Sequence, residues 1–200
     1  MAKKTEIIYT NKYIDLSREE LILGVSQMMT EERLEHVLRV EEKALELAEI
    51  YQGDSEKVSI AALLHDIAKD QVNEEMRDII ISENLNLDLL QYGSAIWHGP
   101  VGAILAKREF QLKDEDILES ITYHTVGARE MSLTTKIIFV ADYIEANRNF
   151  PLVEKARELA KKSLEETIIF KLKETIKYLI DLEEKVYPKT IESYNAWIDK

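Results

Sequence analysis

AALLHDIAKD, residues 61–70, places a histidine and an aspartate side by side in a stretch that is otherwise rich in Ala, Leu and Ile. A predicted helix that is apolar on nearly every side is typical of a protein interior. An ionised carboxylate in such a place costs several kcal/mol unless a partner compensates its charge. We therefore expect His65 and Asp66 to meet a compensating group from elsewhere in the chain.

The composition is that of an ordinary globular protein with a sizeable core. The 200 residues carry a formal net charge of −12, which argues against a protein that binds nucleic acid through phosphate contacts. There is no cysteine, which excludes disulfides and thiolate metal sites. The chain has neither the apolar core of a signal peptide nor a run of about 20 apolar residues that could span a membrane. We expect a cytoplasmic protein without membrane contact.

Helices should dominate the fold, because glycine and proline are sparse and apolar residues recur three and four positions apart. No strand is expected. Ser17 and Thr30 are candidate N-caps of the first two helices, and Asp54 is a candidate cap of the helix that contains the opening segment. Further helices are predicted at about residues 74–84, 100–110, 114–123 and 132–146.

The C-terminal stretch, residues 151–200, differs from the rest. Its segment SLEETIIFKLKETIKYLIDLEEKVY, residues 163–187, predicts one long amphipathic helix that Pro188 ends or kinks. No linker, repeat or low-complexity block separates this stretch from the preceding residues. The sequence therefore predicts one all-α domain over residues 1–200, with a C-terminal helical extension at about 161–200.

The four histidines have similar settings. His36 lies on the flank of the apolar stripe of the second helix, where it can face a cleft. His98 precedes a Gly-Pro pair that should start the next helix, and His124 follows an apolar helix. In KIIFVADYIEANR, Asp142 comes at the end of an apolar run, so a second carboxylate lacks an obvious partner.

A divalent metal ion would compensate both carboxylates and bind the histidines. Neutral imidazole and carboxylate are ligands of borderline and hard divalent metals. The alternative is a hydrogen-bonded core histidine beside a structural aspartate, which is the favoured interpretation for a lone pair such as His65 and Asp66. That alternative weakens when four histidines and two buried aspartates share the same kind of setting.

The order of His36, the pair in LLHDIAKD and the distant Asp142, all on predicted helices, resembles the metal-binding signature of the HD-domain phosphohydrolases. Four segments together, LLHDIAKD, WHGPVGA, YHTVG and KIIFVADYIEANRNFP, resemble the bacterial YqeK family more closely. This resemblance extends over about residues 31–156.

The resemblance implies an all-α HD fold, a dinuclear metal centre, usually of iron, and symmetrical hydrolysis of diadenosine tetraphosphate to two ADP. Two residues, Val126 and Ala146, depart from the family pattern. Neither is of a type that binds metal, so these departures bear on loop shape and substrate fit and not on the metal ligands. The metal ligands implied by the resemblance are His36, His65, Asp66, His98, His124 and Asp142.

Two metal ions bridged by Asp66 would supply the nucleophile and hold the phosphoryl oxygens during in-line attack, so no protein nucleophile is needed. An anionic substrate on an acidic protein also requires local cations. Lys69 is the best candidate, because it follows His65 by four residues and shares its predicted helix face. The alternative is a solvated lysine near a helix C-terminus, which the helix dipole favours. We assign catalysis to Asp66 and Lys69.

Other substrate contacts are predicted on either side of the metal ligands. Arg33 and Arg148 could each bind phosphate in a bidentate manner or hold a carboxylate such as Glu145. Thr125 and Gly127 could offer a hydroxyl and a backbone amide to phosphate, although an ordinary turn explains them almost equally well.

Two other functions are compatible with these residues. An HD-type enzyme could hydrolyse a different nucleotide, such as a guanosine alarmone or a nucleoside triphosphate. The chain could also be a non-catalytic regulatory module whose metal site only holds a nucleotide. The sequence leaves the oligomeric state open, with a homodimer as the candidate assembly.

Overall fold

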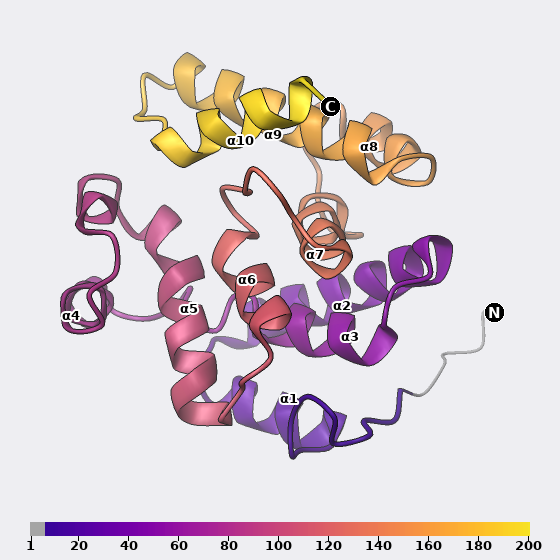
Figure 1. Ribbon diagram of the computed structural model, residues 1–200, viewed down its shortest axis with the longest axis vertical. Helices are drawn as coiled ribbons and strands as arrows, with labels where there is room; N and C mark the ends of the chain where they lie inside the picture. The colour runs from indigo at the N-terminus through magenta and orange to yellow at the C-terminus, as the bar shows by residue number, and fades with distance from the viewer. Residues whose placement is uncertain (1–6) are drawn as a thin grey trace.

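The computed structural model describes residues 7–200, and in this range the chain forms helices joined by turns, without strands (Figure 1). The all-α class is confirmed. The elements are α1 (Arg18–Ser26), α2 (Glu31–Tyr51), α3 (Ser55–Leu64), α4 (Asn73–Ser82), the 3-10 helix η1 (Leu87–Gln91), α5 (Ser94–Phe110), α6 (Glu115–Tyr123), α7 (Leu133–Ile144), α8 (Val153–Ala160), α9 (Leu164–Asp181) and α10 (Pro188–Ile198).

The three predicted N-caps are confirmed. Ser17 caps α1 in a reciprocal arrangement with Glu20, and the Thr30 hydroxyl accepts the first-turn amide of α2. Asp54 accepts the amide of Lys57 at 3.1 Å and so starts α3. Short side chains with an acceptor oxygen determined these boundaries locally, which is why the sequence was sufficient to find them.

The prediction that His65 and Asp66 lie in the middle of a helix is wrong. Helix α3 ends at Leu64, and residues 65–70 form consecutive turns in which the Lys69 amide donates to the Asp66 carbonyl at 2.9 Å. The imidazole Nδ1 of His65 lies 2.6 Å from the carbonyl oxygen of Ala62. In an α-helix that carbonyl would accept the amide of Asp66, so the histidine side chain replaces the next backbone bond.

The predicted start of a helix at Pro100 is also wrong, because α5 begins six residues earlier at Ser94 and contains Pro100. The backbone turns into α5 at Gly93, whose φ of 81° would be strained for any other residue. The carbonyl oxygen of Gly93 then accepts the amides of Ile96 and Trp97. His98 therefore lies inside a helix rather than just before one.

The C-terminal helix is shorter than predicted. Helix α9 ends at Asp181, and Glu183 has a φ of 57°, which breaks the helical path. Pro188 begins a further helix, α10, where its missing amide proton costs no intrahelical bond. The predicted helix over residues 163–187 is thus replaced by α9, a connecting segment and the start of α10.

Packing brings the ends of several helices together. Helix α2 packs against α3 and α7, α5 packs against α6, and every residue of α3 from Val58 to Leu64 is buried. Helices α8, α9 and α10, orange to yellow in Figure 1, lie together next to α7. Among residues 7–200, no helix combines the length and the apolar character needed to cross a bilayer.

Candidate metal centre

Four helices and one turn segment bring the six predicted metal ligands to one place. The ligands come from α2, the turn after α3, the first half of α5, the end of α6 and the second half of α7. Each of these side chains is buried or nearly so. The group consists of His36, His65, Asp66, His98, His124 and Asp142.

Asp66 is shared by two pairs of histidines. Its Oδ2 lies 3.7 Å from the Nε2 of both His36 and His65. Its Oδ1 lies 3.3 Å from the Nε2 of His98 and 3.5 Å from that of His124. Each histidine pair forms a trio with Asp66, and in each trio the possible ligand atoms all lie within 4.8 Å of one another. A carboxylate with its two oxygens directed at two donor sets is suited to bridging two ions.

Asp142 completes one side of this arrangement. Its Oδ1 lies 3.3 Å from the Nε2 of His36, and Arg148 donates to the same oxygen at 2.5 Å. The Nζ of Lys171 lies 3.6 Å from Oδ2. The carboxylate thus stands between a possible metal ligand and two cations from other parts of the chain.

The Nδ1 atoms of all four histidines face hydrogen-bond acceptors outside the centre. Three face a backbone carbonyl about one turn earlier, and the fourth faces a carboxylate. Such partners fix the ring orientation and the tautomer, and they leave Nε2 as the metal-binding atom. The pairs are His65 with Ala62 O at 2.6 Å, His124 with Ile121 O at 2.7 Å, His98 with Ser94 O at 3.1 Å, and His36 with Glu145 Oε1 at 3.3 Å.

The Nε2 atoms then need a cation between them. In the tautomer that Nδ1 donation requires, the Nε2 atoms of His98 and His124 are both acceptors, yet they lie 2.9 Å apart. The Nε2 atoms of His36 and His65 are buried without a hydrogen-bond partner among the described residues. Buried polar atoms are normally paired, and divalent ions bind such imidazole and carboxylate donors. These residues therefore fit a metal centre.

The electrostatics favour the metal-binding protonation states. Burial lowers the pKa of His65 to about 4, against the opposing charge of Asp66, and burial also lowers the pKa of His124. For Asp66, burial opposes ionisation, but the surrounding histidines hold its pKa well below the ordinary value. For Asp142, burial is likewise outweighed, mainly by His36. At neutral pH His65 and His124 are therefore neutral and the two aspartates are charged.

The predicted cations border this centre. The Nζ of Lys69 lies 3.4 Å from the Nδ1 of His98, and burial lowers the pKa of this lysine, against the opposing charge of Asp66. Arg33 donates to Asp66 Oδ2 at 2.9 Å, and Arg148 holds Asp142. The arginine side chains are 27% and 39% exposed, so their outer faces remain accessible to a ligand.

The two other predicted substrate contacts differ in their positions. The hydroxyl of Thr125 lies 3.2 Å from the Nε2 of His98 and 3.0 Å from that of His124, beside the centre. The amide of Gly127 already donates to the carbonyl of Tyr123, and an added Cβ would lie 3.3 Å from Ser193. With a φ of 72°, Gly127 is explained by its turn and by close packing on α10, so we do not retain it as a phosphate donor.

Two residues near the centre were not predicted as part of it. Glu145, considered above only as a partner for the arginines, faces His36 and accepts hydrogen bonds from Arg39 at 3.0 Å and from the amide of Asn147 at 2.7 Å. Lys171 comes from α9, in the C-terminal stretch for which the sequence predicted only a helical extension. A lysine that interrupts the apolar run IIFKL was the signal that could have identified it.

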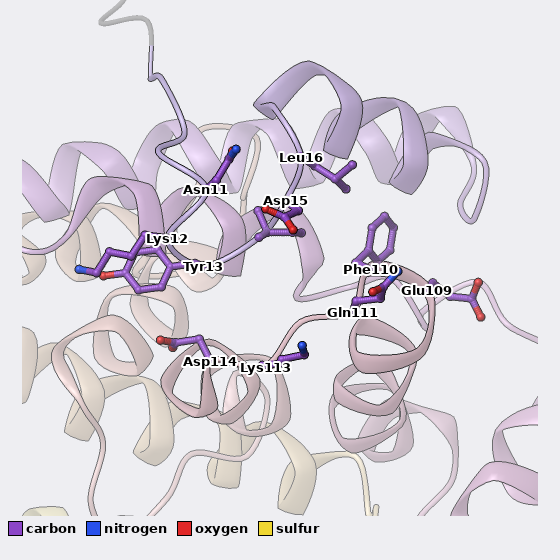
Figure 2. Close-up of a pocket in the computed structure, with 11 residues that line it drawn as sticks. Asn11, Lys12, Tyr13, Asp15, Leu16, Glu109, Phe110, Gln111, Lys113 and Asp114 are labelled. Carbon is purple, nitrogen blue, oxygen red and sulfur yellow. The ribbon is translucent and has the colours of Figure 1, made fainter.

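A surface pocket lies elsewhere on the protein. Its volume is about 530 Å³, and it is lined by residues 11–16 together with residues 109–111, 113 and 114 (Figure 2). These residues include the C-terminal end of α5, whereas His98 lies in the first half of that helix. The 12 positions from His98 to Phe110 correspond to about 18 Å along a helix. The candidate centre is therefore separate from this pocket.

Comparisons with known proteins agree with this geometry. Residues 33–147 match the family described as HD domain. The chain is 44% identical over 183 residues to the symmetrical bis(5'-nucleosyl)-tetraphosphatase of Bacillus subtilis (strain 168), which covers 92% of this chain and 98% of that protein. The protein of the same name from Halalkalibacterium halodurans is 42% identical, with 90% of this chain and 96% of the relative covered.

A solved structure extends the likeness to three dimensions. It is the crystal structure of a predicted HD superfamily hydrolase involved in NAD metabolism from Clostridium acetobutylicum. The TM-score is 0.87 at 37% sequence identity, and the likeness covers 92% of this chain and 98% of that chain. The arrangement of the helices is thus shared over nearly the full length of both proteins.

Proposed function

The chain belongs to the HD domain family and to the family of symmetrical bis(5'-nucleosyl)-tetraphosphatases, and we propose on this basis that it is a metal-dependent hydrolase that cleaves diadenosine tetraphosphate to two ADP. The observation that carries this function is the position of Asp66, whose two carboxylate oxygens face two different pairs of histidines. The relatives do not favour the alternatives of a different nucleotide substrate or a non-catalytic module.

We propose that the centre holds two divalent ions, which matches the two trios of donors that share Asp66. Bound divalent ions lower the pKa of water and offset the charge of phosphoryl oxygens. The donors divide into His36, His65 and Asp142 on one side and His98 and His124 on the other, with Asp66 between them.

The reaction adds one water across the central phosphoanhydride. The water oxygen forms a bond to one of the two inner phosphorus atoms, the bond from that phosphorus to the central bridging oxygen breaks, and each half leaves as ADP. Lys69 is placed to contact the phosphate chain, because its ammonium lies beside His98 at the edge of the centre. The Thr125 hydroxyl, next to His98 and His124, is a second candidate contact.

The arginines of the centre would hold the polyphosphate from outside. Arg33 donates to Asp66 and Arg148 donates to Asp142, both of which are proposed metal ligands, and each arginine side chain is also partly exposed. A guanidinium has five N–H donors in a planar fork, so it can bind a carboxylate and a phosphate together. These cations provide local positive charge in a chain with a net charge of −12.

We also propose iron as the metal, the cytoplasm as the location and a homodimer as the assembly. Imidazole and carboxylate donors suit iron, although they accept other divalent ions as well. Metal analysis after anaerobic purification tests the first proposal, fractionation of cells the second, and sedimentation of the purified protein the third.

The decisive experiment is product identification. The protein is purified anaerobically, its metal content is measured, and diadenosine tetraphosphate is supplied with and without a chelator. We expect ADP as the sole nucleotide product and loss of turnover on chelation. Release of ATP and AMP, or preferred hydrolysis of a guanosine alarmone or nucleoside triphosphate, would refute the assigned substrate and cleavage position.

A further inference from the structure

Lys171 is a buried lysine on α9, outside residues 33–147 that match the HD domain. Only 5% of the residue is exposed. Its ammonium donates to the carbonyl of His124 at 3.0 Å and to the carbonyl of Phe139 at 2.7 Å. One side chain thus links the end of α6, which carries a proposed metal ligand, to α7, which carries another.

The remaining side of the ammonium faces Asp142, with Nζ 3.6 Å from Oδ2. The same Nζ lies 3.8 Å from the ring centroid of Phe139. Two of the three N–H donors of the ammonium bind the carbonyls, and the third side lies against Asp142 and the Phe139 ring. Because the residue is buried among these groups, we treat Lys171 as a positioning residue rather than a catalytic one.

Other C-terminal residues hold the segment that follows His124. The indole of Trp197 donates to the carbonyl of Ala128 at 2.7 Å, and Lys200 donates to the carbonyl of Arg129 at 3.2 Å. Three side chains of the C-terminal stretch, Lys171 among them, thus bind backbone carbonyls between His124 and Arg129. The C-terminal helices are part of the framework that places the ligand at the end of α6.

We propose that Lys171 positions His124 and Asp142 for metal binding, so that the C-terminal helices determine the metal affinity of the HD centre. This inference rests on the proposed metal-dependent function. The ammonium has two opposing effects, because a cation near Asp142 repels a metal ion while its hydrogen bonds hold the two ligand-bearing helices. Nζ is closer to the two carbonyls than to the carboxylate, so removing it chiefly takes a hydrogen bond away from each of two buried carbonyls. Positioning should therefore outweigh repulsion.

The test compares K171M with K173M, a matched control on the same helix whose side chain is 52% exposed. Co²⁺ is titrated into each metal-free protein at pH 7, and Tm is measured with Co²⁺ and with a chelator. We expect K171M to bind Co²⁺ about 10- to 100-fold more weakly, as for loss of other residues that orient metal ligands, and to show a smaller Co²⁺-induced rise in Tm. K173M should behave as wild type.

Each outcome decides the proposal. Unchanged or tighter Co²⁺ binding by K171M would overturn it, because a purely structural role leaves the affinity intact and a dominant repulsion raises it. If K171M does not fold, K171Q is measured in the same way. Its uncharged amide is one bond shorter than the lysine and cannot make both carbonyl bonds, so affinity equal to wild type would again overturn the proposal. Failure of the wild type itself to bind Co²⁺ would instead contradict the proposed metal-dependent function.

Discussion

Replacing Asp66 with asparagine tests the proposed bridge between the two donor sets. The two side chains have the same shape, but asparagine is neutral and offers one oxygen in place of two. In the protein, one carboxylate oxygen faces His36 and His65 and the other faces His98 and His124. Asp66→Asn should therefore deprive one donor set of its shared oxygen and both sets of a negative charge.

The size of the effect follows from the short distances. The carboxylate oxygens lie 3.3 to 3.7 Å from the four histidine nitrogens, so an ion bound by those nitrogens would be close to the lost charge. Two unit charges about 4 Å apart interact by about 4 kcal/mol at an effective dielectric constant of about 20. At 1.4 kcal/mol for each factor of ten, the loss corresponds to about a thousandfold weaker metal binding.

The assay is metal content per chain after dialysis, together with turnover of diadenosine tetraphosphate. Wild type should retain about two ions and Asp66→Asn one or none, with turnover lost in parallel. Asp70→Asn is the matched control, because Asp70 accepts from Thr30 at 2.9 Å and lies 3.6 Å from Arg33 in the same turn segment. Two tightly bound ions in Asp66→Asn would refute the bridging role.

Three further predictions concern neighbouring residues. Lys69→Ala should lower kcat/KM by about a hundredfold at unchanged metal content, because a phosphate contact is lost in the transition state. Lys107→Ala, which removes an exposed lysine, is the control. If both substitutions lowered kcat/KM equally, the assignment of Lys69 as a phosphate contact would be contradicted. Glu145→Gln should weaken Co²⁺ binding by about 10- to 100-fold, because the carboxylate facing the Nδ1 of His36 orients that ring, and an unchanged titration curve would contradict this role. Finally, His65 has a pKa of about 4 when folded and about 6.5 when unfolded, so the unfolded chain binds more protons between these values. The free energy of unfolding of the metal-free protein should therefore be highest above about pH 6.5 and fall by about 3 kcal/mol on acidification to about pH 4. Urea unfolding in the presence of a chelator measures this change. A free energy of unfolding that does not vary with pH would show that His65 is not buried in the neutral form.

Some boundaries of the fold could be predicted because they depend on local interactions. Ser17, Thr30 and Asp54 start their helices through bonds to amides three residues ahead, so a short window of sequence contains both partners. The ends that were predicted wrongly depend on less regular local chemistry. The Nδ1 of the His65 ring faces the carbonyl of Ala62 and so ends α3, which periodicity does not predict. Helix α5 starts after Gly93, six residues before the position that the Gly-Pro pair indicated.

The sequence by itself determined the all-α class and most helices, and it indicated the six residues of the proposed metal centre, because helix periodicity and an unpaired buried charge can be recognised along one chain. Only the tertiary structure decided which oxygen of Asp66 faces which histidine pair, and that Glu145 faces His36 across 109 positions. It likewise decided that Lys171 reaches His124 from 47 positions away. Hydrogen bonds and ion pairs form between atoms that packing brings within about 3 Å of each other. The residues that form them can be far apart along the chain, so no periodic pattern in the sequence predicts the pairing.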